Sequence, residues 1–166
     1  MMGSGKSSVG RLLQKRTGLR CFDVDEMLAA KFALTISEIF AKHGEEKFRD
    51  AETAALKSLE RGEQAIVATG GGIVLRKENV DLLQRLGRIV WLDADQATLF
   101  KRASRKGDRP LLKTENARAA FADLLRTRTP LYAKMAQVRI NTSTRTLDDI
   151  VDLILGKIES LAPPKK

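Results

Sequence analysis

The chain has 166 residues, of which 43% are hydrophobic and 31% charged, and its 30 Lys and Arg against 21 Asp and Glu give a formal charge of +9. This length suits one domain, and we expect a single domain over residues 1–161 with a frayed tail at 162–166. No long apolar run and no apolar segment behind the first residues are present, so we expect neither a transmembrane helix nor a signal peptide. With Cys21 as the single cysteine, a disulfide framework and a multi-cysteine metal site are excluded, which favours a cytoplasmic setting.

The positive charge favours anionic partners: nucleic acid, a membrane surface, or phosphorylated and carboxylated small molecules. A solvated basic surface with no partner is the alternative. The basic residues are spread along the chain, and aromatic residues make up only 5% of it. That is too few for an evident base-stacking platform. We therefore expect a small-molecule partner, and neither nucleic acid nor membrane.

Short apolar runs alternate with longer helical patterns along the chain. The expected strands are 19–24, 65–68, 89–92 and 137–140. The expected helices are 7–16, 25–33, one that starts at the capping box 35–38 and ends near Gly44, 45–59, 78–86, 96–105, 116–127 and 147–161. The strands lack polar alternation, as strands covered on both faces do. The pattern predicts an α/β fold with a parallel sheet, helices on both faces and ligands at the carboxyl ends of the strands.

A glycine-rich run opens the chain. Gly3-Ser4-Gly5-Lys6-Ser7 leads into the first expected helix and matches most of the phosphate-binding pattern G-x-x-x-x-G-K-[ST]. Glycines let backbone N–H groups approach phosphate oxygens, and the helix N-terminus adds unpaired donors. In this chemistry Lys6 reaches the β- and γ-phosphates and the Ser7 hydroxyl binds Mg²⁺. The alternative is a flexible Gly/Ser segment without a ligand.

Two parts of that pattern are missing. Its first glycine would precede Met1, and no strand leads into the loop. Such a strand is central in this architecture, and each large apolar side chain lost from a core costs ~2–5 kcal/mol. We therefore expect a gap in the sheet core, and we expect the natural chain to start further upstream.

Two carboxylates follow the first expected strand, in the pattern Asp23-x-Asp25. Residues two apart on a strand point to the same face. One carboxylate could hold metal-bound water, and the other could accept a proton from a hydroxyl. The alternative is a helix N-cap followed by a first-turn acid, which contributes ~1 kcal/mol.

Other candidate residues lie beside glycines and helix ends. Arg49 lies beside the apolar stripe of the 45–59 helix, and the alternative is an exposed i,i+4 pair with Glu45. Three glycines, 70–72, follow the second strand and suggest close approach of a ligand to the backbone. The alternative is a loose turn without a ligand. Arg109 lies in a polar segment suited to a lid over phosphate. The alternative is an ordinary surface loop. Arg128 lies at an expected boundary between two helices. The alternative is that it is only a charge that faces the dipole at a helix C-terminus.

Together these segments resemble shikimate kinases. The matching pieces, in order, are GSGKSSVGR at 3–11, FDVDEMLA at 22–29, ISEIFAKHGEEKFRDAE at 36–52, ATGGGIV at 68–74, DRPLL at 108–112 and RTRTPLY at 126–132. The resemblance implies a P-loop fold of the nucleoside-monophosphate-kinase type with sheet order 2-3-1-4-5. It also implies a substrate-binding segment at about 25–52, a lid at about 104–116, and ATP-dependent phosphorylation of the 3-hydroxyl of shikimate in chorismate biosynthesis.

The resemblance also implies residue roles. The nucleotide is held by Met2, Gly3, Ser4, Gly5, Lys6, Ser7 and Ser8 around the phosphates, by Arg109 on the lid, and by Arg102 and Arg145 near the adenine. Mg²⁺ is held by Ser7 and, through water, by Asp23. Shikimate is bound by Asp25, Arg49, Gly71, Gly72 and Arg128. Asp25, Lys6 and Arg109 are the expected catalytic residues, with Asp25 as the base.

Three other interpretations remain open at this stage. Another P-loop small-molecule kinase, such as a gluconate kinase, is disfavoured by the triple glycine and the paired arginines. A non-catalytic sensor domain of a transcriptional regulator is disfavoured by Lys6 and the RPLL segment. A truncated, inactive fragment is the third. We expect an active, monomeric enzyme that uses ATP and Mg²⁺.

Overall fold

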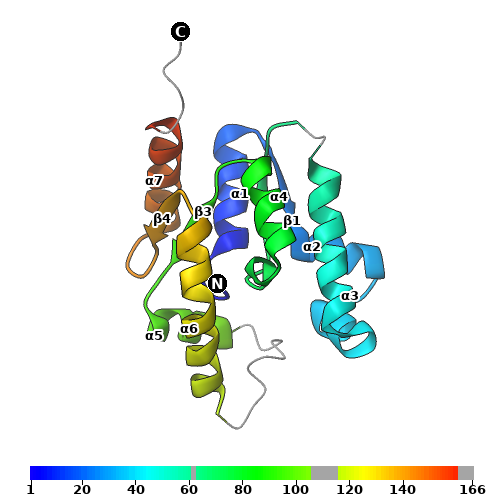
Figure 1. The fold of residues 1–166 in the computed structure, drawn as a ribbon. Coiled ribbons are helices and arrows are strands. Elements are labelled where there is room, and N and C mark those ends of the chain that lie inside the picture. Colours follow the sequence, from blue (N-terminus) through cyan, green and yellow to red (C-terminus); the bar gives the residue numbers. More distant parts are fainter. Residues whose placement is uncertain (61–62, 106–115, 161–166) are drawn as a thin grey trace.

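The computed structural model describes residues 1–60, 63–105 and 116–160, and it alternates helices with short strands (Figure 1). The strands are β1 (Arg20–Asp23), β2 (Ala65–Ala68), β3 (Val90–Asp93) and β4 (Val138–Asn141). The helices are α1 (Lys6–Thr17), α2 (Val24–Phe32), α3 (Ile36–Leu59), the 3₁₀ turn η1 (Ile73–Leu75), α4 (Lys77–Leu86), α5 (Gln96–Ser104), α6 (Ala117–Met135) and α7 (Leu147–Ser160). Each expected strand overlaps an observed one.

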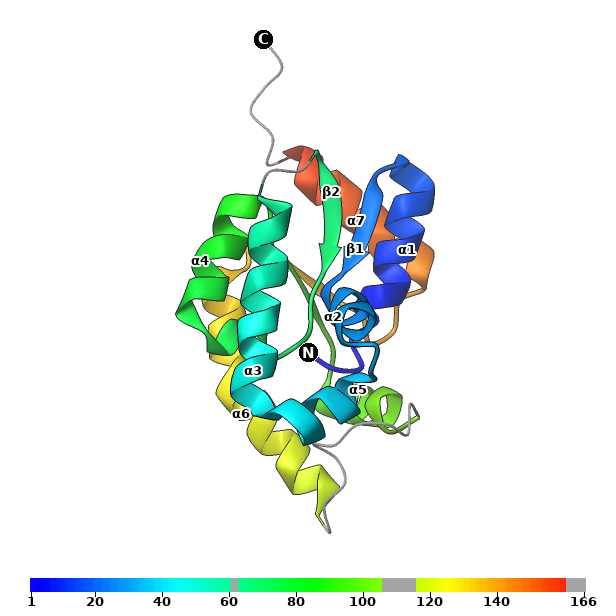
Figure 2. The ribbon, with the colours of Figure 1, turned by 90° about the vertical axis from the view of Figure 1, so that its right-hand side faces the viewer.

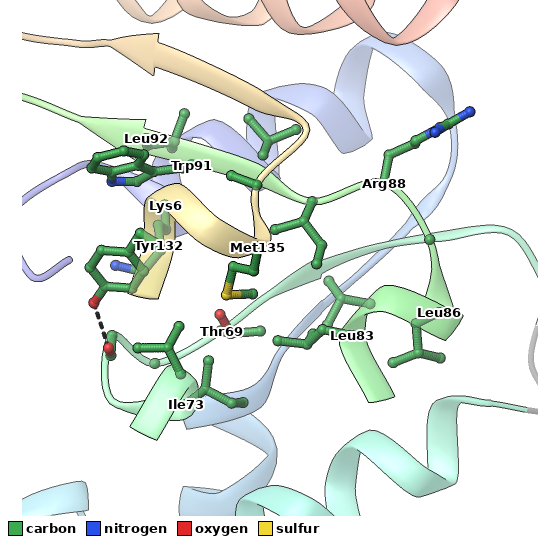
Figure 3. Close-up of a pocket in the computed structure, with 18 of the residues that line it drawn as sticks. Lys6, Thr69, Ile73, Leu83, Leu86, Arg88, Trp91, Leu92, Tyr132 and Met135 are labelled. Atoms are coloured by element: carbon green, nitrogen blue, oxygen red, sulfur yellow. Dashed lines mark hydrogen bonds between the residues drawn. The ribbon is translucent and has the colours of Figure 1, made fainter. Parts of the chain in front are cut away.

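The strands form two parallel pairs. β1 pairs with β2, with Arg20 opposite Ala65, and β3 pairs with β4, with Val90 opposite Val138. Among the described residues, no backbone ladder joins the two pairs. A cavity of about 180 Å³ lies between them and is lined from both β2 and β3 (Figure 3). The expected gap in the sheet core therefore lies between β2 and β3.

Helices cover both faces of the strands, as predicted. On one face, Ile66 and Leu92 belong to an apolar cluster with α1 and α7. Their chain neighbours Val67 and Trp91 point the other way, into a larger cluster with α2 to α6. Figure 2 shows α3 and α4 on one side of β1 and β2, with α1 on the other. This two-sided burial explains why β1, β2 and β3 lack polar alternation, whereas β4 alternates buried and exposed residues.

Helix α3 is bent at a glycine. Thr35 and Glu38 form the predicted capping box at its start. Gly44 has φ 77° and ψ 171°, so the helix is interrupted where the sequence predicts an end. The two predicted segments are thus the two arms of one bent element. The second arm carries Arg49 and Glu52.

The predicted end of the 116–127 helix is wrong. Helix α6 continues to Met135 and carries Pro130 inside it. Proline removes one backbone hydrogen bond, which usually ends a helix. Here the residues beyond it, Tyr132 and Met135, are buried in the core, and this burial holds the last turns in place. Arg128 therefore lies inside helix α6. It stands neither at a boundary between two helices nor at a helix C-terminus, the two positions considered from the sequence.

No helix in the described part of the chain is both long and apolar enough to span a bilayer. Many of the candidate site residues that the structure describes lie where β1 and β2 end and where α1 begins, while Arg102 and Arg145 lie at the end of β4.

Candidate active site

The first turn of α1 is open to an anion. Gly3 and Gly5 have φ values of 78° and 88°, which place them in the left-handed region that glycine adopts without strain. No side chain caps this end of α1, and its first turn contains no acidic residue. The backbone of this first turn lies at the positive end of the helix dipole, which favours an anion. A Cβ on Gly3 would lie 2.4 Å from the carbonyl oxygen of Leu99, so only glycine fits where this loop crosses α5.

Lys6 is held over the same loop. Its Nζ donates a hydrogen bond of 2.6 Å to the Met1 carbonyl oxygen, and Ser4 Oγ donates one of 2.8 Å to the same atom. Met2 is buried behind this loop, and Ser8 is exposed on the first turn of α1. Lys6 also lines the cavity between β2 and β3, together with Tyr132 and Met135 (Figure 3).

Ser7 and Asp23 meet at the junction of α1 and β1. Ser7 Oγ donates a hydrogen bond of 2.7 Å to Asp23 Oδ2, while Asp23 Oδ1 accepts one of 3.0 Å from the backbone N–H of Asp25. Asp23 is therefore the N-cap of α2, which was the alternative to a metal-binding role. Its second carboxylate oxygen nevertheless accepts the hydrogen bond from Ser7. A hydroxyl and a carboxylate are the hard oxygen ligands that suit Mg²⁺, which usually keeps few protein ligands beside phosphate oxygens and water.

The described residues contain no group of three or more His, Cys, Asp and Glu side chains placed to hold a metal. A cation at Ser7 and Asp23 would thus take most of its ligands from elsewhere. This fits a metal that arrives with a nucleotide, because phosphate oxygens then complete its shell.

Asp25, Gly70 and Glu52 converge from three elements. A Cβ on Gly70 would lie 2.8 Å from Asp25 Oδ1 and 3.1 Å from Glu52 Oε1. The absence of a side chain at Gly70 therefore lets both carboxylates approach the same point of the backbone after β2. Glu52 is fully buried, and burial raises its pKa, while its hydrogen bond to Arg49 acts in the opposite direction. Its Oε1 has no hydrogen-bond partner among the described residues.

Arg49 is enclosed on several sides. Its Nη1 donates a hydrogen bond of 2.6 Å to Glu52 Oε2, and its Nη2 donates one of 3.0 Å to Glu45 Oε1. The i,i+4 pair with Glu45 thus exists, but Arg49 itself is 9% exposed, unlike a surface pair. A Cβ on Gly72 would lie 2.4 Å from Arg49 Nη2. The glycine run therefore lets the guanidinium reach the backbone, which a loose turn would not require.

Arg128 approaches the same cluster from α6. It is 6% exposed, and its charge acts on both Glu52 and Tyr132. Burial raises the pKa of Tyr132 to about 12, although the charge and hydrogen bond of Arg128 oppose the rise. The Tyr132 hydroxyl donates a hydrogen bond of 2.5 Å to the Gly71 carbonyl oxygen (Figure 3). Gly71 is thereby fixed between α6 and the phosphate loop.

Arg102, from α5, and Arg145 both contact the chain at the end of β4. Arg102 donates hydrogen bonds of 3.1 Å and 2.9 Å to the hydroxyl and carbonyl oxygens of Thr142, and Arg145 Nε donates one of 3.1 Å to the carbonyl oxygen of Asn141. Both side chains therefore brace the loop after β4. Arg109 and most of the expected lid, 106–115, lie outside the described residues.

Sequence reasoning gave no role to Glu52 or Tyr132. The signal for Glu52 is its position three residues after Arg49, on the same helix face. The signal for Tyr132 is weaker, because only the unexpected continuation of α6 past Pro130 brings it to Gly71.

The family model described as shikimate kinase matches residues 2–159. The chain belongs to the shikimate kinase family. The shikimate kinase of Symbiobacterium thermophilum is 42% identical and covers 96% of this chain and 92% of its own length. That of Thermodesulfovibrio yellowstonii is 40% identical, over 99% of this chain and 94% of its own.

Solved structures agree with this family. The shikimate kinase from Acinetobacter baumannii, in complex with shikimate, has a TM-score of 0.91 at 36% identity and covers 96% of this chain and 89% of its own. A gluconokinase from Sinorhizobium meliloti has a TM-score of 0.59 at 20% identity, which shows the fold alone. The α/β P-loop fold is thus confirmed, and family membership makes this chain a kinase.

Proposed function

We propose that this chain transfers the γ-phosphoryl group of ATP to the 3-hydroxyl of shikimate. One observation carries the proposal beyond the family assignment. The uncapped start of α1, two carboxylates and two buried arginines from different helices lie around the same glycine-rich turn after β2. This arrangement offers separate places for a polyphosphate, a reacting hydroxyl and an anionic ring substituent.

The phosphate side would consist of the backbone of Met2, Gly3, Ser4, Gly5 and Ser8 with the Lys6 ammonium. Arg102 and Arg145 would lie near the adenine, and Arg109, outside the described residues, would bind the phosphates. Ser7 and Asp23 would hold Mg²⁺, which when bound supplies charge neutralisation on the β- and γ-phosphates. Lys6 would add its charge to the same oxygens.

The acceptor side would hold shikimate by its carboxylate. Arg49 and Arg128 are planar and always charged, so they can bind a carboxylate bidentately, which lysine cannot do. The backbone N–H groups of Gly71 and Gly72 would bind the same molecule. Asp25 would then contact the reacting hydroxyl.

The reaction requires little covalent chemistry from the protein. The 3-hydroxyl oxygen forms a bond to the γ-phosphorus while the bond from that phosphorus to the bridging oxygen breaks, and ADP leaves with the bonding electrons. Asp25 accepts the hydroxyl proton and later returns it to water. The remaining residues contribute position and charge, which are the main sources of rate enhancement in phosphoryl transfer.

A coupled assay of ADP release tests the reaction. The protein is supplied with ATP and Mg²⁺ and with shikimate, gluconate or no acceptor. We expect ADP release only with shikimate. NMR spectroscopy of the product should show that the phosphate is attached to the 3-oxygen. Equal release with gluconate, or none with either acceptor, would contradict the proposal.

Asp25→Asn tests the base. The variant should lose at least about a hundredfold in kcat, the lower end of what general-base catalysis contributes, while ATP still binds. Asp81→Asn, on the exposed face of α4, is the matched control.

We also propose that the enzyme is cytoplasmic and monomeric. Size-exclusion chromatography with light scattering tests the oligomeric state.

A further inference from the structure

Arg49 is held by two glutamates of different character. A guanidinium has five N–H donors, and its Nε and Nη2 form the edge that best fits a carboxylate bidentately. Glu52 takes Nη1 alone, at 2.6 Å. Glu45 Oε1 takes the other edge, with Nε at 3.3 Å and Nη2 at 3.0 Å. The edge suited to an acceptor's carboxylate thus already carries a carboxylate from this chain.

The two glutamates differ in their freedom to move. The Glu52 side chain is fully buried, whereas 63% of the Glu45 side chain is exposed. Glu45 also directly follows Gly44, where α3 is bent. Glu52 can therefore only hold Arg49 in place, while Glu45 can rotate into water without disturbing the core.

The other sides of the guanidinium are occupied. Its Cζ lies 5.9 Å and 5.3 Å from the ring centroids of Phe40 and Phe48. Gly72 approaches so closely that a Cβ there would overlap Nη2. An incoming carboxylate that takes the Nε–Nη2 edge must therefore replace Glu45.

We propose that Glu45 is an internal competitor for the acceptor's carboxylate. It occupies the binding edge of Arg49 while no acceptor is bound, and it turns to solvent when the acceptor enters. It thereby sets a threshold: a carboxylate that makes no contacts besides Arg49 gains too little to displace it. This inference rests on the proposed role of Arg49 and adds a specificity-determining residue to it.

Glu45→Gln tests the proposal, because glutamine keeps the shape and removes the charge. We expect the KM for shikimate to fall about two- to fivefold, the range set by the strength of an exposed ion pair. The kcat and the KM for ATP should not change, and inhibition by acetate should strengthen. Glu46→Gln is the matched control, since Glu46 is the next residue and is exposed. It should leave all of these values unchanged.

The opposite results are distinct. If Glu45→Gln leaves the KM for shikimate unchanged, Glu45 only forms an exposed ion pair on the helix. If it raises that KM, Glu45 supports the position of Arg49. Either result overturns the proposal. Arg49→Lys separates this from the proposed function. If that variant leaves the KM for shikimate unchanged, the role of Arg49 itself fails. If it raises the KM while Glu45→Gln has no effect, only the competitor role fails.

Discussion

The Ser7 hydroxyl donates a 2.7 Å hydrogen bond to the carboxylate of Asp23, which joins the first turn of α1 to the end of β1. Neither residue is close to the other in sequence. Their contact brings together the two side chains of the proposed Mg²⁺ site, the Ser7 hydroxyl as the direct ligand and the Asp23 carboxylate, which would hold the cation through water.

Ser7→Ala should raise the Mg²⁺ concentration needed for half-maximal activity by about tenfold, because a hydrogen bond to a charged group contributes ~1.5 kcal/mol and the cation also loses a ligand. The measurement is turnover against Mg²⁺ at saturating ATP and shikimate. Ser58→Ala removes a hydroxyl from an exposed part of α3 and should behave as the unmodified protein. An unchanged Mg²⁺ requirement for Ser7→Ala would remove Ser7 from the metal site.

Arg128→Lys should raise the KM for shikimate about tenfold or more and leave the KM for ATP unchanged. Lysine keeps the charge but cannot bind a carboxylate with two parallel hydrogen bonds. Steady-state kinetics with each substrate varied in turn gives both values. Arg126→Lys, on the exposed face of the same helix, is the control. Equal behaviour of the two variants would make Arg128 a structural residue.

Gly72→Ala should reduce activity without unfolding the protein. The backbone of Gly72 has φ −87°, which alanine adopts readily, but the new Cβ would lie 2.4 Å from Arg49 Nη2. The guanidinium must shift, so we expect a higher KM for shikimate and little change in the melting temperature. Gly156→Ala, in an open position on α7, should keep full activity and gain ~0.5–1 kcal/mol of stability. Normal kinetics for Gly72→Ala would show that Arg49 tolerates displacement.

Asp95 should make stability depend on pH in the acid range. As N-cap of α5 it accepts hydrogen bonds from the backbone and side chain of Thr98 and from Ser143, which lower its pKa from 3.8 to about 2. A group with a lowered pKa in the folded state stabilises the protein above its unfolded pKa, and that contribution is lost as the pH falls through the folded value.

Asp95→Ala should therefore melt at a lower temperature at pH 7, and the difference from the unmodified protein should narrow between about pH 4 and pH 2. Circular dichroism melts across that range provide the measurement. A difference that stays constant down to pH 2 would show that ionised Asp95 does not contribute through its charge.

Much of the fold could be predicted from sequence because the decisive signals are local. The expected strand 65–68 coincides with β2, and the other expected strands differ from the observed ones by one residue at each end. Apolar runs bounded by helical patterns, together with capping residues such as Thr35, identify elements without tertiary information. The family resemblance also assigned Ser7 and Asp23 to one metal site, and their side chains do meet in the structure.

What could not be predicted depends on tertiary packing. Pro130 argues locally for a helix end, and only the burial of Tyr132 and Met135 explains why α6 continues and why Arg128 faces inward. Glu52 looks like any surface carboxylate in a charged helix. Its burial follows from the position of Gly70, whose missing side chain leaves room for it beside Asp25.

The cavity between β2 and β3 has a mechanical consequence. A backbone ladder makes neighbouring strands move as one body, whereas packed side chains permit shear. Among the described residues the two strand pairs share no ladder, and α1 packs against β1, β2 and α7 and so couples one half to the other. Helix α1, whose first turn belongs to the proposed nucleotide site, therefore links the two strand pairs across this seam, together with the side-chain packing of the larger apolar cluster.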